Sequence, residues 1–152
     1  MRLIKIVFIL FFPFVLFAQK ENLDFILTSK LQKHKEIKLI YNDLNVDVSD
    51  DDQYSHILTN KLIKDLIKND FKVIFPQELK SICANCSNMN DFNKDEKYIY
   101  FYIETQNSGG RTTINGVIYQ DNQIVGSFTS YRSYWTNKRF DDLSETIVER
   151  MK

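Results

Sequence analysis

The stretch KYIYFYIET, residues 97–105, decides the fold because it is apolar or aromatic on both of its faces. A strand with two apolar faces belongs in the interior of a sheet. The chain after it predicts two more strands, at 111–120 and 123–134, which follow the turn residues 107–110 and the two-residue turn Asp121-Asn122. Because such short turns join strands that run in opposite directions, this half of the chain predicts an antiparallel three-strand meander.

The residues before this stretch predict a strand, a helix and a second strand. Residues 36–42 (EIKLIYN) and 71–75 (FKVIF) have strand character. Between them, apolar residues recur at helical spacing, namely Tyr54, Leu58, Leu62 and Leu66. The acidic residues 50–52 can cap the start of this helix. Two strands joined through a helix form a crossover unit, so we expect them to be parallel, with the helix covering one face.

Three further helices complete the prediction. They are a short amphipathic helix at 21–34, a short helix from Pro76 to about Ile82, and a terminal amphipathic helix from about Lys138. The predicted fold class is α+β: a single mixed sheet of about five strands with helices packed on it. Residues 19–152 should form one domain, since a chain of this length can bury about two thirds of the surface that it exposes when unfolded.

The first 18 residues have the pattern of a secretory signal peptide. Arg2 and Lys5 precede the apolar run Ile6–Phe17, and we place the cleavage site between Ala18 and Gln19. At roughly 1.5 Å per residue, this run is too short for the ~30 Å hydrocarbon core of a bilayer. An uncleaved anchor is the alternative. The sequence therefore predicts a periplasmic or secreted protein with no integral membrane span after cleavage, and no lipid-acceptor cysteine follows the cleavage site.

The charge balance argues against nucleic acid as the main partner. The chain has 20 basic and 20 acidic side chains, and cleavage removes Arg2 and Lys5, so the mature protein is slightly acidic. Phosphate binding depends on clustered lysine and arginine. In its few glycines and prolines, its many asparagines and lysines and its leader, the sequence is similar in style to exported proteins of AT-rich bacteria of the Bacteroidetes type.

The only two cysteines lie in SICANCSN, residues 81–88. In an oxidising compartment Cys83 and Cys86 should form a disulfide, which closes so short a loop that it contributes roughly 2 kcal/mol. The alternative function is a periplasmic thiol-disulfide redox protein, because Cys-x-x-Cys is also the pattern of reactive dithiols. Against this alternative, Cys83 falls at the carboxyl end of a predicted helix, where the helix dipole raises the pKa of a thiol.

Patterns for other sites are weak. Haem attachment requires a histidine where Ser87 stands, and His34 and His56 have no common zinc spacing with the cysteines. The acidic stretch 47–52 (DVSDDD) lacks the glycine and the final bidentate acid of a calcium loop, and helix capping explains it. The common hydrolase, metalloprotease and phosphate-loop motifs are missing. We therefore expect no cofactor, no metal and no catalysis.

Aromatic residues supply the candidate contacts. Tyr98, Tyr100 and Tyr102 share one face of their predicted strand, and Tyr131 and Trp135 lie near the end of the last strand. One interpretation is that these rings fill an interface between sheet and helices. If the helices cover only one face of the sheet, the other face would present the tyrosines to a partner. The last strand is also a candidate for pairing with a strand of another chain.

The hairpin INGVIYQDNQIVGSFTSYRS, residues 114–133, adds a resemblance. With the crossover unit, the short helix and the terminal helix, it resembles small periplasmic envelope modules such as the periplasmic domain of the curli-export lipoprotein and the amino-terminal domain of the Tol-system propeller protein. The likeness is architectural and covers most of the mature chain. It implies a non-catalytic binding or assembly module of the bacterial envelope, with an envelope protein or peptide as partner.

Overall fold

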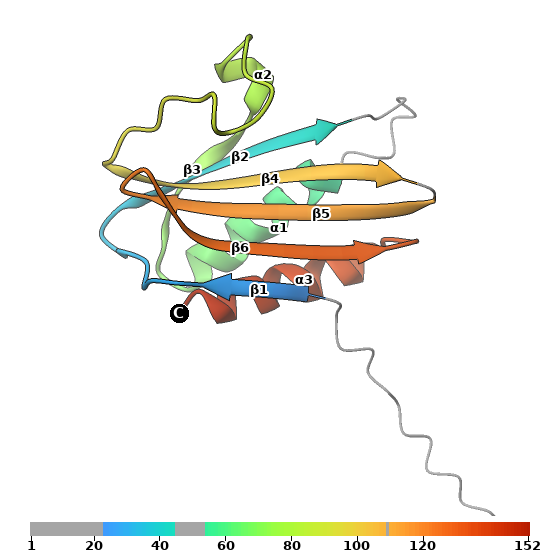
Figure 1. Ribbon diagram of the computed structural model, residues 1–152. Helices are drawn as coiled ribbons and strands as arrows, with labels where there is room; N and C mark the ends of the chain where they lie inside the picture. The colour runs from blue at the N-terminus through green and yellow to red at the C-terminus, as the bar shows by residue number, and fades with distance from the viewer. Residues whose placement is uncertain (1–22, 45–53, 109) are drawn as a thin grey trace, which may run out of the picture.

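The computed structural model describes residues 23–44, 54–108 and 110–152 (Figure 1). The signal peptide predicted at 1–18 and the acidic stretch at 47–52 lie outside these residues. The elements, in chain order, are β1 (Leu23–Leu27), β2 (Glu36–Leu44), α1 (Tyr54–Lys68), β3 (Lys72–Glu78), α2 (Leu79–Ile82), β4 (Tyr98–Ser108), β5 (Arg111–Gln120), β6 (Gln123–Arg132) and α3 (Asn137–Arg150).

The strands form one mixed sheet in the order β1-β6-β5-β4-β2-β3 (Figure 1). The predicted crossover is confirmed, because β2 runs parallel to β3 and also to β4. The predicted meander is confirmed as well, since β4, β5 and β6 pair antiparallel. β4 lies inside the sheet and is buried on both faces: Phe101 on one face is 0% exposed and Tyr100 on the other is 2% exposed.

The prediction of about five strands is wrong, because the sheet has six strands. Residues 23–27, expected in a helix at 21–34, form the edge strand β1, which pairs antiparallel with β6 and places Leu27 opposite Gly126. The spacing of Leu23, Ile26 and Leu27 fits a helix, but their burial follows the two-residue period of a strand: Leu23 is 8% exposed and Ile26 is 63% exposed. Gly126 makes the pairing possible, since a Cβ there would lie 2.9 Å from Cδ1 of Leu27 and 3.1 Å from the carbonyl oxygen of Ile26.

The helix predicted from Pro76 to Ile82 is also corrected. β3 continues through Pro76 to Glu78, and α2 occupies only Leu79–Ile82. β3 is the second edge strand, and its register with β2 shifts between Lys38 and Ile40. Proline has no N–H to donate, so it is tolerated at such an irregular sheet edge. Pro76 therefore lies in a strand and does not mark the first turn of a helix.

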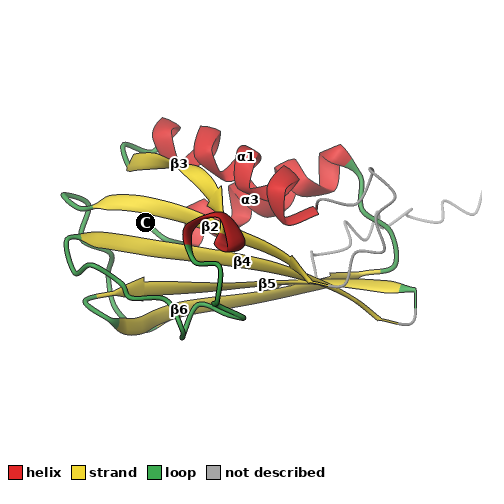
Figure 2. Cartoon of the chain, turned by 90° about the horizontal axis from the view of Figure 1, so that it is seen from above, coloured by secondary structure: helices red, strands yellow, loops and turns green. Residues whose placement is uncertain are grey.

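Helices cover one face of the sheet as a full layer. α1 and α3 lie side by side behind the sheet in Figure 1 and above it in Figure 2. Between them and the sheet lies the main core, which includes Ile37, Leu62, Phe101, Phe128, Phe140 and Ile147. α2 and residues 83–97, here called the cap, lie on the opposite face over a second and smaller cluster. We call this opposite face the tyrosine face.

Candidate functional site

The tyrosine face is half covered by the cap. Alternate residues of β4 and β5 point to this face, and three of their tyrosines, Tyr100, Tyr102 and Tyr119, are 2%, 4% and 6% exposed. They pack in the second cluster with residues of β2, α2 and the cap, namely Ile40, Leu79, Cys86 and Met89. Burial of these phenols in an apolar cluster raises the pKa of all three.

The cap is held in shape by a disulfide and by its own hydrogen bonds. Cys83 and Cys86 lie at disulfide distance, with Cα atoms 5.4 Å apart. The carboxylate of Asp91 accepts hydrogen bonds from the backbone N–H and the hydroxyl of Ser87 and from the backbone N–H of Asn88, at 3.0, 2.9 and 3.3 Å. These bonds lower the pKa of Asp91. The Nζ atom of Lys94 donates to the carbonyl oxygens of Met89 and Phe92.

Hydrogen bonds also join the cap to the sheet. The backbone N–H of Asp95 donates to the hydroxyl oxygen of Tyr100 at 2.9 Å, and the hydroxyl of Tyr119 donates to Oδ1 of Asn90 at 3.3 Å. Cys86 is 9% exposed and packs in the same cluster. The cap is therefore a built layer, with a disulfide at its start and tyrosine hydroxyls at its base.

A pocket of about 190 Å³ opens where the cap ends on the sheet. Three of its residues come from the cap and five from β4 and β5; they are Asn88, Met89, Asn90, Tyr102, Glu104, Asn115, Val117 and Tyr119. The pocket thus combines three side-chain amides, two phenols and one carboxylate with two apolar walls. Tyr102 and Tyr119 are 4% and 6% exposed, so little of either ring is open to a ligand.

Among the residues that the structure describes, Glu104 is the only charged one that lines this pocket. The hydroxyl of Tyr102 donates to Oε2 of Glu104 at 3.1 Å, and it accepts a hydrogen bond from Nδ2 of Asn42 at 3.3 Å. Nearby, the hydroxyl of Thr129 donates to Oδ1 of Asn115 at 3.0 Å. Oδ1 of Asn42, a residue 2% exposed, has no hydrogen-bond partner within the described chain. The pocket is a polar site built around a half-buried carboxylate.

Beyond the pocket, the tyrosine face is open. The strand registers place Ile26 beside Ser127, Thr113 beside Tyr131, and Ile124 beside Tyr119, all on this face. Ile26, Ile124 and Tyr131 are 63%, 59% and 45% exposed. Between and beside them lie half-buried residues, namely Thr113, Asn115, Val117, Ser127 and Thr129, and the exposed Asp24 lies opposite Thr129. We call this surface of β1, β5 and β6 the open half.

The structure does not bring the five predicted contact residues together on one surface. Tyr100 and Tyr102 are buried by the cap, and Trp135, 5% exposed, stacks on Phe140 in the core below the helices, with ring centroids 5.0 Å apart. Three of the five predicted contact residues are therefore buried in the structure. Tyr98 stays half-buried with Nζ of Lys38 3.8 Å from its ring centroid, and Tyr131 is exposed on the open half.

Sequence reasoning missed Glu104, Asn115 and Tyr119. A signal for Glu104 was present, since it continues the alternation of Tyr98, Tyr100 and Tyr102 along β4. The pairing of Glu104 with Asn115 and of Tyr100 with Tyr119 depends on the register between β4 and β5. The turn predicted between these two strands limits their register, so the sequence contained a signal for Asn115 and Tyr119 as well.

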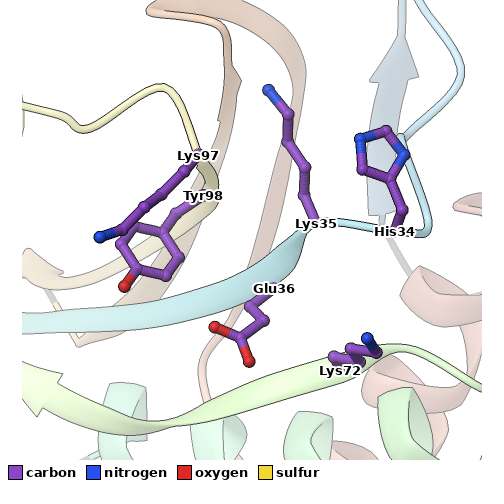
Figure 3. A pocket seen from close by; sticks show the side chains of 6 residues that line it. All are labelled: His34, Lys35, Glu36, Lys72, Lys97 and Tyr98. Atoms are coloured by element: carbon purple, nitrogen blue, oxygen red, sulfur yellow. The ribbon is translucent and has the colours of Figure 1, made fainter.

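A second, wider hollow of about 530 Å³ lies at the amino-terminal ends of β2, β3 and β4 (Figure 3). It is lined by His34, Lys35, Glu36, Lys72, Lys97 and Tyr98. Lys35 pairs with Asp121 and Lys97 with Asp95, and Figure 3 shows Lys97 lying along the ring of Tyr98. Because two of its three lysines have acidic partners and Glu36 adds a negative charge, this hollow has no strong excess of either charge.

Comparison with known proteins shows little. No family model and no curated protein matches the chain. Two solved structures of PelC dodecamers from Paraburkholderia phytofirmans, one of a point variant, are similar in structure, with TM-scores of 0.47 and 0.48. Each is 8% identical in sequence, and the match covers 86% of this chain and 94% of the PelC chain. No function follows from a likeness of this size.

Two further properties concern the described ranges only. None of the helices within 23–44, 54–108 and 110–152 is both long enough and apolar enough to cross a membrane. In the same part of the chain, His, Cys, Asp and Glu side chains do not gather in groups of three or more that could hold a metal ion.

Proposed function

We propose that this chain is an exported, non-catalytic binding module of the bacterial cell envelope, and that a protein or peptide partner docks on the open half of the tyrosine face. The leader pattern at residues 1–18 supports export. The architectural resemblance to small periplasmic envelope modules supports a binding or assembly role, and membership of that group is itself part of this proposal.

One observation carries the proposed function: the cap covers only part of the tyrosine face. Tyr131, Ile26 and Ile124 stay exposed on the rest of it, among hydroxyl and amide side chains. Exposed apolar and aromatic groups interspersed with polar side chains are found in protein–protein interfaces, in which tyrosine is enriched. A partner protein would bury these groups and satisfy the surrounding polar side chains.

The chemistry of the pocket supports binding rather than catalysis. The described lining holds asparagine, methionine, valine, tyrosine and one glutamate; it has no serine, cysteine, histidine or lysine, and no second carboxylate that could form an acid–base pair with Glu104. Burial raises the pKa of Tyr102 and Tyr119, so both phenols are neutral hydrogen-bond donors at physiological pH. The pocket thus offers fixed hydrogen bonds and one negative charge to a ligand.

The proposal is tested by site-specific cross-linking in cells that express the full chain. A photoreactive amino acid replaces Tyr131 on the open half or, as a control, Ile67 of α1, which is 57% exposed on the helical side. We expect one defined adduct from position 131 and none from position 67. Equal adducts from both positions, or an adduct from position 67 alone, would contradict docking on the open half.

The alternative function is a thiol-disulfide redox protein that uses Cys83 and Cys86. In its favour, Cys83 is only half-buried. Against it, Cys83 is the cap residue at the carboxyl end of α2, and Cys86 is 9% exposed in an apolar cluster. A reactive thiolate is instead favoured by a helix amino terminus or a neighbouring cation.

A further inference from the structure

We propose that the pocket beside the open half receives a lysine or arginine side chain of the docked partner, with the carboxylate of Glu104 as its counter-ion. This inference rests on the proposed function and deepens it, since it names the group that anchors the partner.

Glu104 carries a charge without a counter-charge. The ion pairs among the described residues join Lys35 to Asp121, Lys61 to Asp141 and Lys97 to Asp95, and none of them involves Glu104. Its one hydrogen bond comes from the neutral hydroxyl of Tyr102, which occupies one lone-pair site of Oε2. An ionised carboxylate can accept about four hydrogen bonds, so most of its capacity remains for a ligand.

Lys94, a lysine of the cap, has partners other than Glu104. Nζ of Lys94 donates to the carbonyl oxygens of Met89 and Phe92 at 2.9 and 3.1 Å, and it lies 4.8 Å from the ring centroid of Tyr119. Two of the three N–H donors of Lys94 are therefore used within the cap, and its ammonium group contacts the sheet through the ring of Tyr119. Among the described residues no cation lies within ion-pair distance of Glu104, which leaves this carboxylate available to a basic group of a partner.

The walls of the pocket suit a long basic side chain. Lysine and arginine carry an apolar stem and a charged head, and they bury the stem along apolar surface while the head finds a polar partner. Met89 and Val117 provide apolar wall, and Glu104 with the side-chain oxygens of the asparagines provides acceptors for the head group. Tyr102 and Tyr119 hold the acceptors Glu104 and Asn90 in place.

Size and ring burial argue for a side chain rather than a sugar. At about 190 Å³, the pocket is smaller than the ~300–1,000 Å³ typical of small-molecule sites, and it accommodates one side chain. Tyr102 and Tyr119 are 4% and 6% exposed, so their ring faces are covered and cannot stack on a sugar ring. The single negative charge also disfavours an anionic ligand.

The test uses the mature protein, labelled with 15N, and three probes: acetyl-Gly-Lys-Gly-amide, the same peptide with norleucine in place of lysine, and methyl glucoside. We expect the lysine peptide to shift the side-chain amide signals of Asn90 and Asn115, which line the pocket. We expect at least about tenfold weaker binding of the norleucine peptide, because it lacks the charged hydrogen bond.

Glu104→Gln should lower affinity for the lysine peptide about tenfold, since the amide keeps the shape and loses the charge. Glu145→Gln, an exposed residue of α3, removes the same charge on the helical side and should leave affinity unchanged. The inference is overturned if Glu104→Gln binds the lysine peptide as well as the natural protein, if neither peptide shifts these amides at millimolar concentration, or if the glucoside shifts them.

The two proposals fail in distinguishable ways. An adduct from position 131 that persists in a Glu104→Gln background, together with no effect of lysine on the pocket amides, would remove this inference and leave docking on the open half. If the protein with natural Glu104 gives no adduct from position 131 but the lysine peptide still shifts the pocket amides, the docking proposal is removed and the pocket proposal stays.

Discussion

The hydroxyl of Tyr102 donates a hydrogen bond to Oε2 of Glu104, 3.1 Å away and two residues further along β4. Tyr102 is buried by the cap, whereas Glu104 is half-buried where the cap ends. This bond therefore joins the covered part of the tyrosine face to its open half. It fixes a carboxylate at the border, beside the surface on which we propose that a partner docks.

The burial of Tyr102 and Tyr119 predicts a dependence of stability on alkaline pH. Burial raises the pKa of Tyr102 and Tyr119 in the folded protein above the value near 10 of an unfolded chain. Their contribution to the free energy of unfolding is therefore complete below about pH 10 and is lost as the pH rises toward the folded-state pKa.

We expect ultraviolet titration to show a fraction of the tyrosines ionising later than the exposed ones, and only as the protein unfolds. Tyr102→Phe should remove one late-ionising group and lower stability at neutral pH by about 1 kcal/mol, because a buried hydrogen bond is lost. Tyr134→Phe, which changes an exposed tyrosine, is the matched control. Ionisation of all tyrosines together near pH 10 in the folded protein would contradict the burial of this pair.

The pairing of β1 with β6 predicts a cost for a side chain at position 126. A Cβ on Gly126 would lie 3.1 Å from the backbone oxygen of Ile26, which cannot move aside as a flexible side chain could. We expect Gly126→Ala to lower the free energy of unfolding by about 1–3 kcal/mol in chemical denaturation. Ser127→Ala, one residue further along β6, should change it by less than about 0.5 kcal/mol. Equal effects of the two substitutions would argue against β1 as the sixth strand.

The crossover and the meander could be predicted from sequence because their signals are local. The helical spacing of the apolar residues of α1 is strong, and Asp121 and Asn122 both adopt the positive φ that a two-residue hairpin turn requires, 53° and 60°. β1 could not be predicted this way. Its five residues fit a helix as well as a strand, and the strand that decides between the two lies about one hundred residues away along the chain.

The candidate site was predicted only in part. Alternation along β4 correctly placed Tyr98, Tyr100 and Tyr102 on one face, but no local pattern shows that residues 83–97 fold back over two of them. Trp135 follows the last strand and turns into the helical core, where it stacks on Phe140. Burial of an aromatic ring depends on which segment covers it, and that is a tertiary contact.

If the Cys83–Cys86 disulfide has a structural role, it should stabilise the folded protein modestly and should have a low reduction potential. Replacing Cys83 and Cys86 together by alanine should lower the free energy of unfolding by about 2 kcal/mol and should shift the amide signals of Asn88 and Asn90 in the cap. Titration against a glutathione buffer should give a potential below about −300 mV. A potential above about −220 mV would favour the redox alternative instead.

The leader predicts the amino terminus of the mature protein. Mass spectrometry of the protein from the envelope or the medium should find Gln19 as its first residue, because Ala18 is the small residue that precedes the expected cleavage site. An exported fraction that still carries Met1 would support the anchor alternative.

The affinity of the cross-linked partner for variants of the open half tests the central claim most directly. Once the partner is identified, titration calorimetry compares Tyr131→Ala with Ile67→Ser, which changes an exposed apolar residue on the helical side. Our account predicts a loss of about tenfold or more for Tyr131→Ala, as expected when a tyrosine is a main contact of an interface, and an unchanged affinity for Ile67→Ser. An unchanged affinity for Tyr131→Ala would contradict it.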